Sequence, residues 1–217
     1  MARYQAVFFD LDGTLVDTAP DLGYALNTLL QQEGYASLSH ELIRPEASNG
    51  SAGLLGLGFG ITTNDADYLP LQRRFIQIYQ DNIARQSDLF PGISEVLKQL
   101  EDHHIPWGII TNKPAFLTDP LLKQLGLTQR AACVVSGDTT PHSKPHPAPM
   151  LYACELTSHA PENCIYIGDA VRDIEAGKNA NMATLTARYG YINAEDDPED
   201  WQADGIIDHP SELLQWL

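Results

Sequence analysis

Two carboxylates follow the first apolar run of the sequence. Asp10 comes directly after Ala6–Phe9, a run typical of a buried strand, and Asp12 follows two residues later. Gly13 allows the chain to turn sharply at this point. Carboxylates this close repel each other, and a cation that bridged them would relieve the repulsion. The alternative interpretation is an Asp-x-Asp-Gly turn that merely ends a strand, because such turns are common.

A second pair of carboxylates follows another apolar run. Asp169 comes directly after Cys164–Gly168, and Asp173 lies four residues further on, so both can share one face of a helix. Ligands bind beyond the carboxyl ends of strands in open α/β sheets, which makes this position a candidate site. Alternatively, these acids only stabilise the N-terminus of a helix through its macrodipole.

Polar groups after a third apolar run could hold an anion. Thr111 and Asn112 stand at the end of the run over residues 106–111. Thr111 and the backbone N–H groups of the turn can donate to phosphate oxygens. Lys144 lies before a proline-limited loop that begins a helix, where its charge could offset paired carboxylates and a phosphate. A helix N-cap and an ordinary surface lysine are the structural alternatives.

A parallel sheet is the element that would bring these residues together. Near-continuous apolar runs are typical of strands covered on both faces, and they occupy residues 6–9, 106–111, 132–136, 164–168, 182–186 and 205–207. Helical patterns lie between them, at residues 93–103, 115–125, 147–156 and 174–179. This alternation predicts βαβ units and a doubly wound, Rossmann-like α/β fold.

The interval between the first two strands predicts an all-helical insert. Residues 21–33 and 69–84 have helical spacing of apolar residues, and no convincing strand is found between residues 16 and 87. The expected division is therefore a catalytic core of residues 1–15 and 88–217 and a helical cap of residues 16–87. Five glycines crowd residues 50–60, which indicates either a mobile segment facing the active site or a turn that links helices.

Four motifs, taken in order, resemble the haloacid dehalogenase-like hydrolase superfamily. They are D-x-D-G-T at residues 10–14, Thr111-Asn112, Lys144 before a helix, and G-D-x-x-x-D at residues 168–173. The resemblance spans nearly the whole chain, and the insert stands where that superfamily has its type 1 cap. It implies that Asp10 is a nucleophile and Asp12 an acid/base.

The same resemblance implies further roles. Thr111 and Asn112 would hold the phosphoryl group and Lys144 would offset its charge. The implied cofactor is Mg²⁺, and the implied metal ligands are Asp10, the carbonyl of Asp12, Asp169 and, in support, Asp173. Family members that remove halide need no leaving-group acid at the position of Asp12, so its presence favours phosphoryl transfer through an aspartyl-phosphate.

The substrate implied by the resemblance is a small phosphomonoester. The chain is similar to phosphoglycolate phosphatases, but Ser48-Asn49-Gly50 and the segment at residues 189–192 look more like N-acetylmuramic acid 6-phosphate phosphatases. A β-phosphoglucomutase-like phosphotransferase and a non-catalytic phosphate-binding module remain alternatives. Arg44 and Ser48 lie where relatives contact the substrate. We expect Arg44 to contact an anionic group, and a surface salt bridge is the alternative.

Charge and composition limit the possible partners. The formal net charge is -16, which disfavours nucleic acid and anionic membranes as partners. Three cysteines without a C-x-x-C pair favour buried thiols in a reducing compartment over disulfides. The opening apolar run is interrupted by Asp10 and Asp12, so it does not read as a signal peptide. We therefore expect a cytoplasmic monomer or homodimer.

Overall fold

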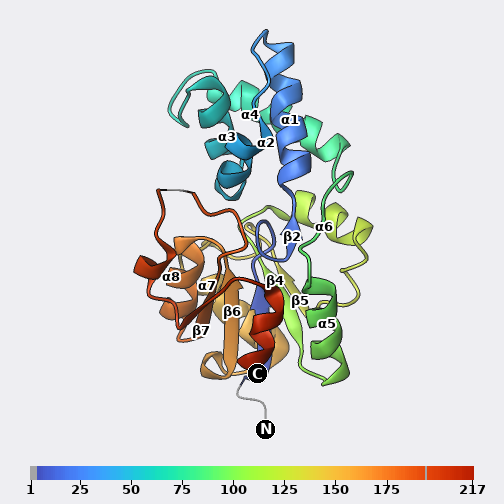
Figure 1. Cartoon of the computed structure of the whole chain (residues 1–217), viewed down its shortest axis with the longest axis vertical. Helices are drawn as coiled ribbons and strands as arrows, with labels where there is room; N and C mark the ends of the chain where they lie inside the picture. The colour runs from blue at the N-terminus through green and yellow to red at the C-terminus, as the bar shows by residue number, and fades with distance from the viewer. Residues whose placement is uncertain (1–3, 194) are drawn as a thin grey trace.

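A six-stranded parallel sheet forms the centre of the molecule (Figure 1). The computed structural model describes residues 4–193 and 195–217. The strand order is β5-β4-β1-β6-β7-β8. The strands are β1 Ala6–Phe9, β4 Trp107–Ile110, β5 Cys133–Val135, β6 Cys164–Gly168, β7 Ala183–Ala187 and β8 Gly205–Ile207. Each lies within one residue of a predicted run, so the doubly wound, Rossmann-like fold is confirmed.

Alternate residues of β1 explain why its sequence is apolar throughout. Val7 and Phe9 pack into one hydrophobic cluster, and Ala6 and Phe8 pack into a second cluster. Both clusters exclude water, so each face of the strand contributes apolar burial. The strand lies between β4 and β6, which places Asp10 near the middle of the carboxyl edge of the sheet.

Helices cover both faces of this sheet. Helices α7 Ala148–Thr157 and α8 Val171–Asn179 contribute to the second cluster. Helices α5 Ile93–Asp102 and α6 Ala115–Gln124 contribute to the first cluster. Short 3₁₀ helices complete the domain: η2 Pro161–Asn163, η3 Pro198–Trp201 and η4 Pro210–Gln215. Helix α8 begins three residues before its predicted start, because the Asp173 carboxylate accepts a hydrogen bond from the Ala170 N–H at 3.1 Å.

The helical insert consists of α1 to α4. Its elements are α1 Ala19–Gln32, α2 His40–Ile43, η1 Arg44–Asn49, α3 Gly50–Phe59 and α4 Tyr68–Asp81. Figure 1 shows these helices at the end of the molecule opposite both termini. The apolar face expected for α1 is buried, as Leu26, Leu29 and Leu30 are almost fully covered. These leucines belong to the same buried cluster as Val7 and Phe9 of β1, so the insert and one face of the sheet share a continuous apolar core.

A two-stranded antiparallel ribbon joins the insert to the sheet domain, where no strand was predicted. It pairs β2 Val16–Asp17 with β3 Asp88–Leu89. A strand of two residues is too short to show the alternation of apolar and polar residues by which strands are predicted. The two partners also lie about seventy residues apart in the sequence, so their pairing leaves no local pattern. The ribbon lies at the ends of the predicted cap, whose boundaries at residues 16 and 87 stay a prediction.

The glycine-crowded segment is a helix whose first residues line the cavity, so the alternative of a turn that links helices is wrong, and the mobility of the segment stays a prediction. Leu54 and Leu55 of α3 are fully buried and hold the helix against its neighbours. A Cβ atom on Gly58 would lie 2.9 Å from a methyl carbon of Leu26 in α1, so glycine permits a close approach of the two helices. Tertiary packing here outweighs the poor helix propensity of glycine.

Candidate active site

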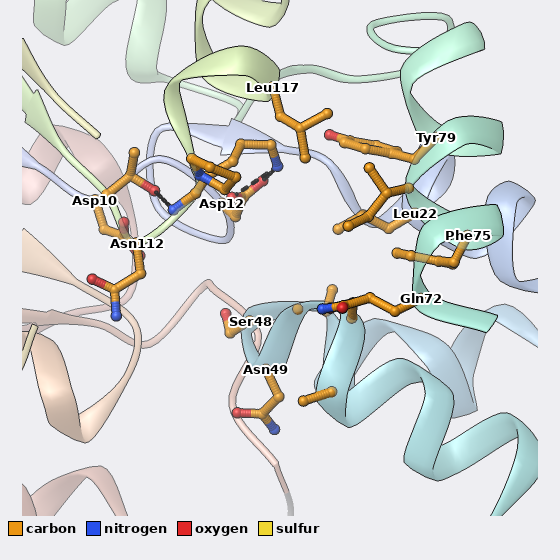
Figure 2. Close-up of a pocket in the computed structure, with 18 of the residues that line it drawn as sticks. Asp10, Asp12, Leu22, Ser48, Asn49, Gln72, Phe75, Tyr79, Asn112 and Leu117 are labelled. Carbon is orange, nitrogen blue, oxygen red and sulfur yellow. Dashed lines mark hydrogen bonds and ion pairs between the residues drawn. The ribbon is translucent and has the colours of Figure 1, made fainter. Parts of the chain in front are cut away.

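A cavity of about 460 Å³ lies between the carboxyl edge of the sheet and the helical insert (Figure 2). The sheet domain contributes Asp10, Asp12, the segment from Thr111 to Pro114, Leu117, Lys144 and Arg172 to its lining. The insert contributes residues from α1, η1, α3 and α4. All four motifs thus meet at one edge of the sheet: three of them line the cavity with their named residues, and the fourth contributes Arg172 to the lining and Asp169 and Asp173 beside Asp10.

Three buried carboxylates gather beside the cavity. Asp10, Asp169 and Asp173 each offer an oxygen within 4.8 Å of the others. Asp10 follows β1, and its backbone N–H donates to the carbonyl of Ile167 at 2.8 Å, which ties it to β6. A Cβ atom on Gly13 would lie 2.1 Å from Asp169, so only glycine lets this turn approach the carboxylate.

The carboxylates disfavour one another's charge. Burial raises the pKa of Asp10 to about 6, with Lys144 opposing the rise and Asp173 adding to it. Burial and then the charges of Asp10 and Asp173 raise the pKa of Asp169 to about 7. Mg²⁺ binds carboxylate oxygens, and its charge would relieve this repulsion. The donor set therefore fits a hard divalent cation.

Magnesium should stabilise the protein more at pH 7.5 than at pH 5.5. The raised pKa values of Asp10 and Asp169 exceed the value of about 4 for an unfolded chain, so protons bind the folded state more tightly. That stabilisation is fully present below about pH 4 and is lost as the pH rises from there through the folded values of about 6 and 7, above which the acids are ionised and can bind Mg²⁺. At 100 times its Kd, Mg²⁺ adds about 2.7 kcal/mol, which corresponds to roughly 5–10 °C in Tm.

Thermal melts with and without Mg²⁺ at the two pH values measure this effect. The variant Asp102→Asn is the matched control, because the Asp102 carboxylate is exposed and pairs with Lys98 on the surface. It should show the same Mg²⁺ response as the wild type. An equal rise in Tm at both pH values would contradict a site built from acids with raised pKa values.

Lys144 is buried between two of the carboxylates. Its ammonium lies 2.8 Å from Asp10 and 2.7 Å from Asp173. It also donates to the carbonyl of Ile110 at 2.9 Å and meets the hydroxyl of Tyr166 at 2.8 Å. Burial alone would lower the pKa of Lys144, but the two carboxylates outweigh burial and raise it. The side chain is therefore a cation at neutral pH.

The Asn112 side chain holds the backbone of Lys144 in place. Its carbonyl oxygen accepts from the Lys144 N–H, and its amide donates to the Lys144 carbonyl, both at 3.0 Å. The Thr111 hydroxyl accepts from the N–H of Lys113 at 3.1 Å. Both residues line the cavity. Their contact with a phosphoryl group stays a prediction.

The Asp12 carboxylate points to a different set of partners. Lys113 binds both of its oxygens, at 2.8 and 3.0 Å, and Thr18 donates a short hydrogen bond to one of them. Burial would lower the pKa of Lys113, but the charge of Asp12 outweighs burial and raises it. The Lys113 ammonium also lies 4.8 Å from the ring centroid of Tyr79 in α4. Asp12 is thus held apart from the three-carboxylate cluster.

Replacing Lys113 with Met should lower kcat by about 10- to 100-fold for alkyl phosphates. This expectation follows from the acid/base role that the resemblance implies for Asp12: the change removes the cation that holds its carboxylate, and general acid catalysis contributes typically 10²- to 10⁴-fold. The loss should be smaller for p-nitrophenyl phosphate, because p-nitrophenolate leaves with little help from an acid. Steady-state kinetics on both substrates measure this difference. Equal losses would show that Lys113 does not act through proton transfer.

Contacts from the insert reach the carboxylates. The hydroxyl of Ser48 donates to Asp169 at 2.8 Å, and Arg172 donates to the Ser48 carbonyl at 2.7 Å. Arg44 lies elsewhere: its guanidinium pairs with Asp17 at 2.8 Å and stacks 4.9 Å from the ring centroid of Tyr191. Arg44 does not belong to the described lining of the cavity. The substrate contacts expected of Ser48 and Arg44 stay predictions.

Several site residues were missed by the sequence analysis. Lys113 directly follows the Thr-Asn motif, and Arg172 stands inside the G-D-x-x-x-D motif, so motif membership was the available signal. Tyr166 interrupts an otherwise apolar strand, and a buried phenol needs a hydrogen-bond partner. Tyr79 gave no such signal, because its place at the cavity depends on how α4 packs.

The comparisons with known proteins agree with this site. A family model described as haloacid dehalogenase-like hydrolase matches residues 7–187. The chain belongs to this family. It is 38% identical over 211 residues to the N-acetylmuramic acid 6-phosphate phosphatase of Pseudomonas putida, covering 97% of this chain and 95% of the relative. It is 39% identical over 211 residues to the phosphoglycolate phosphatase of Xanthomonas campestris, with the same coverage.

Solved structures support the same fold for this family member. The crystal structure of a predicted phosphoglycolate phosphatase from Haemophilus somnus matches with a TM-score of 0.86 and 27% identity, covering 99% of this chain and 98% of the other. The enzyme is thus a hydrolase similar to phosphoric monoester phosphatases, as expected. None of the helices in residues 4–193 and 195–217 combines the length and apolarity needed to cross a membrane.

Proposed function

We propose that this family member is a Mg²⁺-dependent phosphatase that cleaves a small phosphomonoester through an aspartyl-phosphate on Asp10. The observation that carries the proposal is the surroundings of Asp10: a buried carboxylate on the cavity wall, 2.8 Å from Lys144 and beside Asp169 and Asp173. Mg²⁺ held by these acids, with the carbonyl of Asp12, would offset the charge of a phosphoryl group.

Asp10 performs the first step of this mechanism. Its carboxylate attacks phosphorus, the bond from phosphorus to the ester oxygen breaks, and Asp12 donates a proton to that departing oxygen. Lys144 offsets negative charge on the carboxylates and on the incoming phosphate, which would otherwise repel the nucleophile. Thr111, at the cavity wall, can donate to a phosphoryl oxygen.

Asp12 then reverses its role. Its carboxylate takes a proton from a water molecule as the water oxygen attacks the phosphorus of the aspartyl-phosphate. The bond between phosphorus and the Asp10 oxygen breaks, which releases inorganic phosphate and restores the carboxylate. Splitting the hydrolysis into two displacements lets one side chain assist both.

The wall contributed by the insert supports a neutral leaving group. In the described part of the chain its lining residues carry no formal charge, and its polar members are Ser48, Asn49, Ser51 and Gln72. The carboxylate of phosphoglycolate would find no cation on this wall. A cavity of about 460 Å³ also falls within the range of roughly 300–1,000 Å³ that holds larger organic ligands.

The size of the cavity and the amide and apolar side chains of this wall support a second, more specific candidate, N-acetylmuramic acid 6-phosphate. Its acetamido and hydroxyl groups could form hydrogen bonds with neutral amides such as Asn49 and Gln72. Its methyl groups could pack against Phe75 and Leu22 on the same wall. Two relatives that carry this name support the candidate. Its lactyl carboxylate has no cation opposite it on this wall, so N-acetylglucosamine 6-phosphate, which lacks the lactyl group, is the informative comparison.

A substrate panel tests both candidates. We expect kcat/KM to be at least a hundredfold higher for one of the two amino-sugar phosphates than for 2-phosphoglycolate, which corresponds to roughly 2.7 kcal/mol of differential transition-state binding. A higher kcat/KM for 2-phosphoglycolate than for either amino-sugar phosphate would identify phosphoglycolate as the better candidate substrate. Hydrolysis of p-nitrophenyl phosphate at the same rate with and without Mg²⁺ would contradict the metal-dependent mechanism. No hydrolysis at all would favour a binding module. Formation of a sugar bisphosphate would instead favour a phosphotransferase.

We also infer that the enzyme works in the cytoplasm as a monomer or homodimer, without nucleic acid or membrane partners. Its net charge of -16 supports the lack of polyanionic partners. Cys133, Cys154 and Cys164 are buried free thiols, which suits a reducing compartment. Gel filtration and fractionation of cells would test these inferences.

A further inference from the structure

Arg172 lines the cavity and forms no ion pair with a carboxylate in residues 4–193 and 195–217. The other two cations of the described lining are engaged: Lys144 pairs with two carboxylates, and Lys113 binds both oxygens of a third. The Arg172 side chain is half-buried, and its hydrogen bond goes to a neutral group, the carbonyl of Ser48, at 2.7 Å. Its charge can therefore meet an anion in the cavity.

The Arg172 guanidinium carries more hydrogen-bond donors than this contact uses. Arginine holds several N–H groups in a planar fork, and the bond to Ser48 engages one of its terminal nitrogens. The fork matches the oxygens of a phosphate, which can accept two parallel hydrogen bonds. Donors in a half-buried site need water or a ligand as partner. Arg172 thus brings both charge and further donors to the cavity.

The position of Arg172 is fixed by both the chain and the insert. In the sequence it precedes Asp173 in the first turn of α8. In space, Ser48 links it to Asp169: the Ser48 hydroxyl donates to this carboxylate at 2.8 Å, and the Ser48 carbonyl accepts from Arg172. Figure 2 shows Ser48 toward the side of the view where Asn112 lies, whereas the labelled residues of α4 stand on the other side. Arg172 therefore lies near the carboxylate cluster.

The charge balance of this cluster gives Arg172 a role that Lys144 does not fill. When all are ionised, Asp10, Asp169 and Asp173 exceed the single charge of Lys144 by two, which a divalent cation would balance. Burial would lower the pKa of the Arg172 guanidinium, but the charges of these acids outweigh burial and raise it. Arg172 would then be the excess positive charge of a metal-loaded site. Such an excess favours a phosphate dianion, in a chain whose net charge is -16.

We propose that Arg172 is a further catalytic residue, whose guanidinium binds non-bridging oxygens of the phosphoryl group. This inference rests on the proposed phosphatase function, because it places the phosphoryl group between Asp10 and the start of α8. A cation at this point would stabilise the negative charge of the phosphoryl oxygens in the transition state. Because the Ser48 carbonyl holds the same guanidinium, the insert would help to orient it.

Calorimetric titration with inorganic phosphate at saturating Mg²⁺ tests this contact without requiring turnover. Arg172→Gln keeps an amide that can donate to the Ser48 carbonyl but removes the charge, and we expect it to raise the Kd for phosphate at least tenfold. The Kd for Mg²⁺ should not rise in this variant, because the change removes a positive charge near the acids. Arg172→Lys keeps the charge but loses the planar fork, so its Kd for phosphate should rise less, by about threefold or more. This second variant decides the test if thermal melts show that Arg172→Gln is not folded.

Steady-state kinetics then separate the phosphoryl group from the leaving group. The phosphoryl group is common to all phosphomonoesters. Arg172→Gln should therefore lower kcat/KM at least tenfold, and by a similar factor, for N-acetylmuramic acid 6-phosphate, N-acetylglucosamine 6-phosphate and p-nitrophenyl phosphate. A loss confined to N-acetylmuramic acid 6-phosphate would overturn the inference, because it would place the guanidinium at the lactyl carboxylate instead.

Arg130→Gln is the matched control. Arg130 precedes β5, at the amino ends of the parallel strands, and pairs with Glu101 at 3.0 Å, away from the described cavity lining. That variant should keep the wild-type Kd for phosphate and the wild-type kcat/KM. A Kd within twofold of the wild type in folded Arg172→Gln would overturn the inference, as would a wild-type protein that does not bind phosphate at millimolar concentrations. Binding that depends on Arg172 in a protein that hydrolyses no ester would refute the proposed function and leave the phosphate contact standing.

Discussion

Asp10→Asn should lower kcat by about 10⁴-fold or more. The amide is nearly the same shape as the carboxylate but is a poor nucleophile, so no aspartyl-phosphate can form at residue 10. Removing the nucleophile of a covalent mechanism typically costs many orders of magnitude, as only binding and electrostatic contributions remain. Because the change also removes a charge next to Asp169 and Asp173, the metal-free variant should fold at least as stably as the wild type.

Steady-state kinetics with p-nitrophenyl phosphate at saturating Mg²⁺ would measure the loss. Acid quenching of the wild type during turnover, followed by mass spectrometry, should find phosphate on the peptide that contains Asp10. Asp102→Asn, which makes the same chemical change at an exposed surface position, should keep wild-type kcat. Turnover by Asp10→Asn at more than a tenth of the wild-type rate would exclude Asp10 as nucleophile.

Lys144→Met should destabilise the metal-free protein by about 3–5 kcal/mol. Removing one member of a buried ion pair leaves uncompensated charge, here on Asp10 and Asp173, at 2.8 and 2.7 Å from the lost ammonium. Methionine has a similar length, so the main change is electrostatic. Mg²⁺ should recover part of the loss, because the cation would offset the same carboxylates.

Urea unfolding with and without Mg²⁺ would measure both effects. Lys98→Met is the matched control, since Lys98 pairs with Asp102 on the exposed face of α5 and surface pairs of this kind contribute less than about 0.5 kcal/mol. A loss in Lys144→Met no larger than in the control would show that the buried ammonium does not offset the carboxylates. A large loss of stability that Mg²⁺ does not reduce would show that Mg²⁺ does not bind the carboxylates that Lys144 neutralises.

Much of the sheet domain could be predicted because its signals are local. A strand buried on both faces must be apolar over consecutive residues, and this is why β1 and β6 were found close to their observed bounds. Parallel strands bring their carboxyl ends to one edge, so the meeting of Asp10 with Asp169 followed from the strand assignment.

The insert was less predictable because its structure depends on contacts between distant residues. The glycines of α3 argue against a helix when they are considered alone, and only the close packing of Gly58 against α1 explains them. The ribbon of β2 and β3 is equally invisible to a local pattern, since neither strand is long enough to show a period.

The sequence alone determined that Asp10 stands at the end of a buried strand among other polar residues. Its spacing and motifs were sufficient for that, because strand burial and the direction of parallel strands are local consequences of the chain. Tertiary structure decided which side chains surround the acids. It paired Arg44 with Asp17, brought Lys113 to Asp12, and placed the Ser48 hydroxyl against Asp169. These outcomes depend on how the insert packs over the sheet edge, which no local pattern encodes.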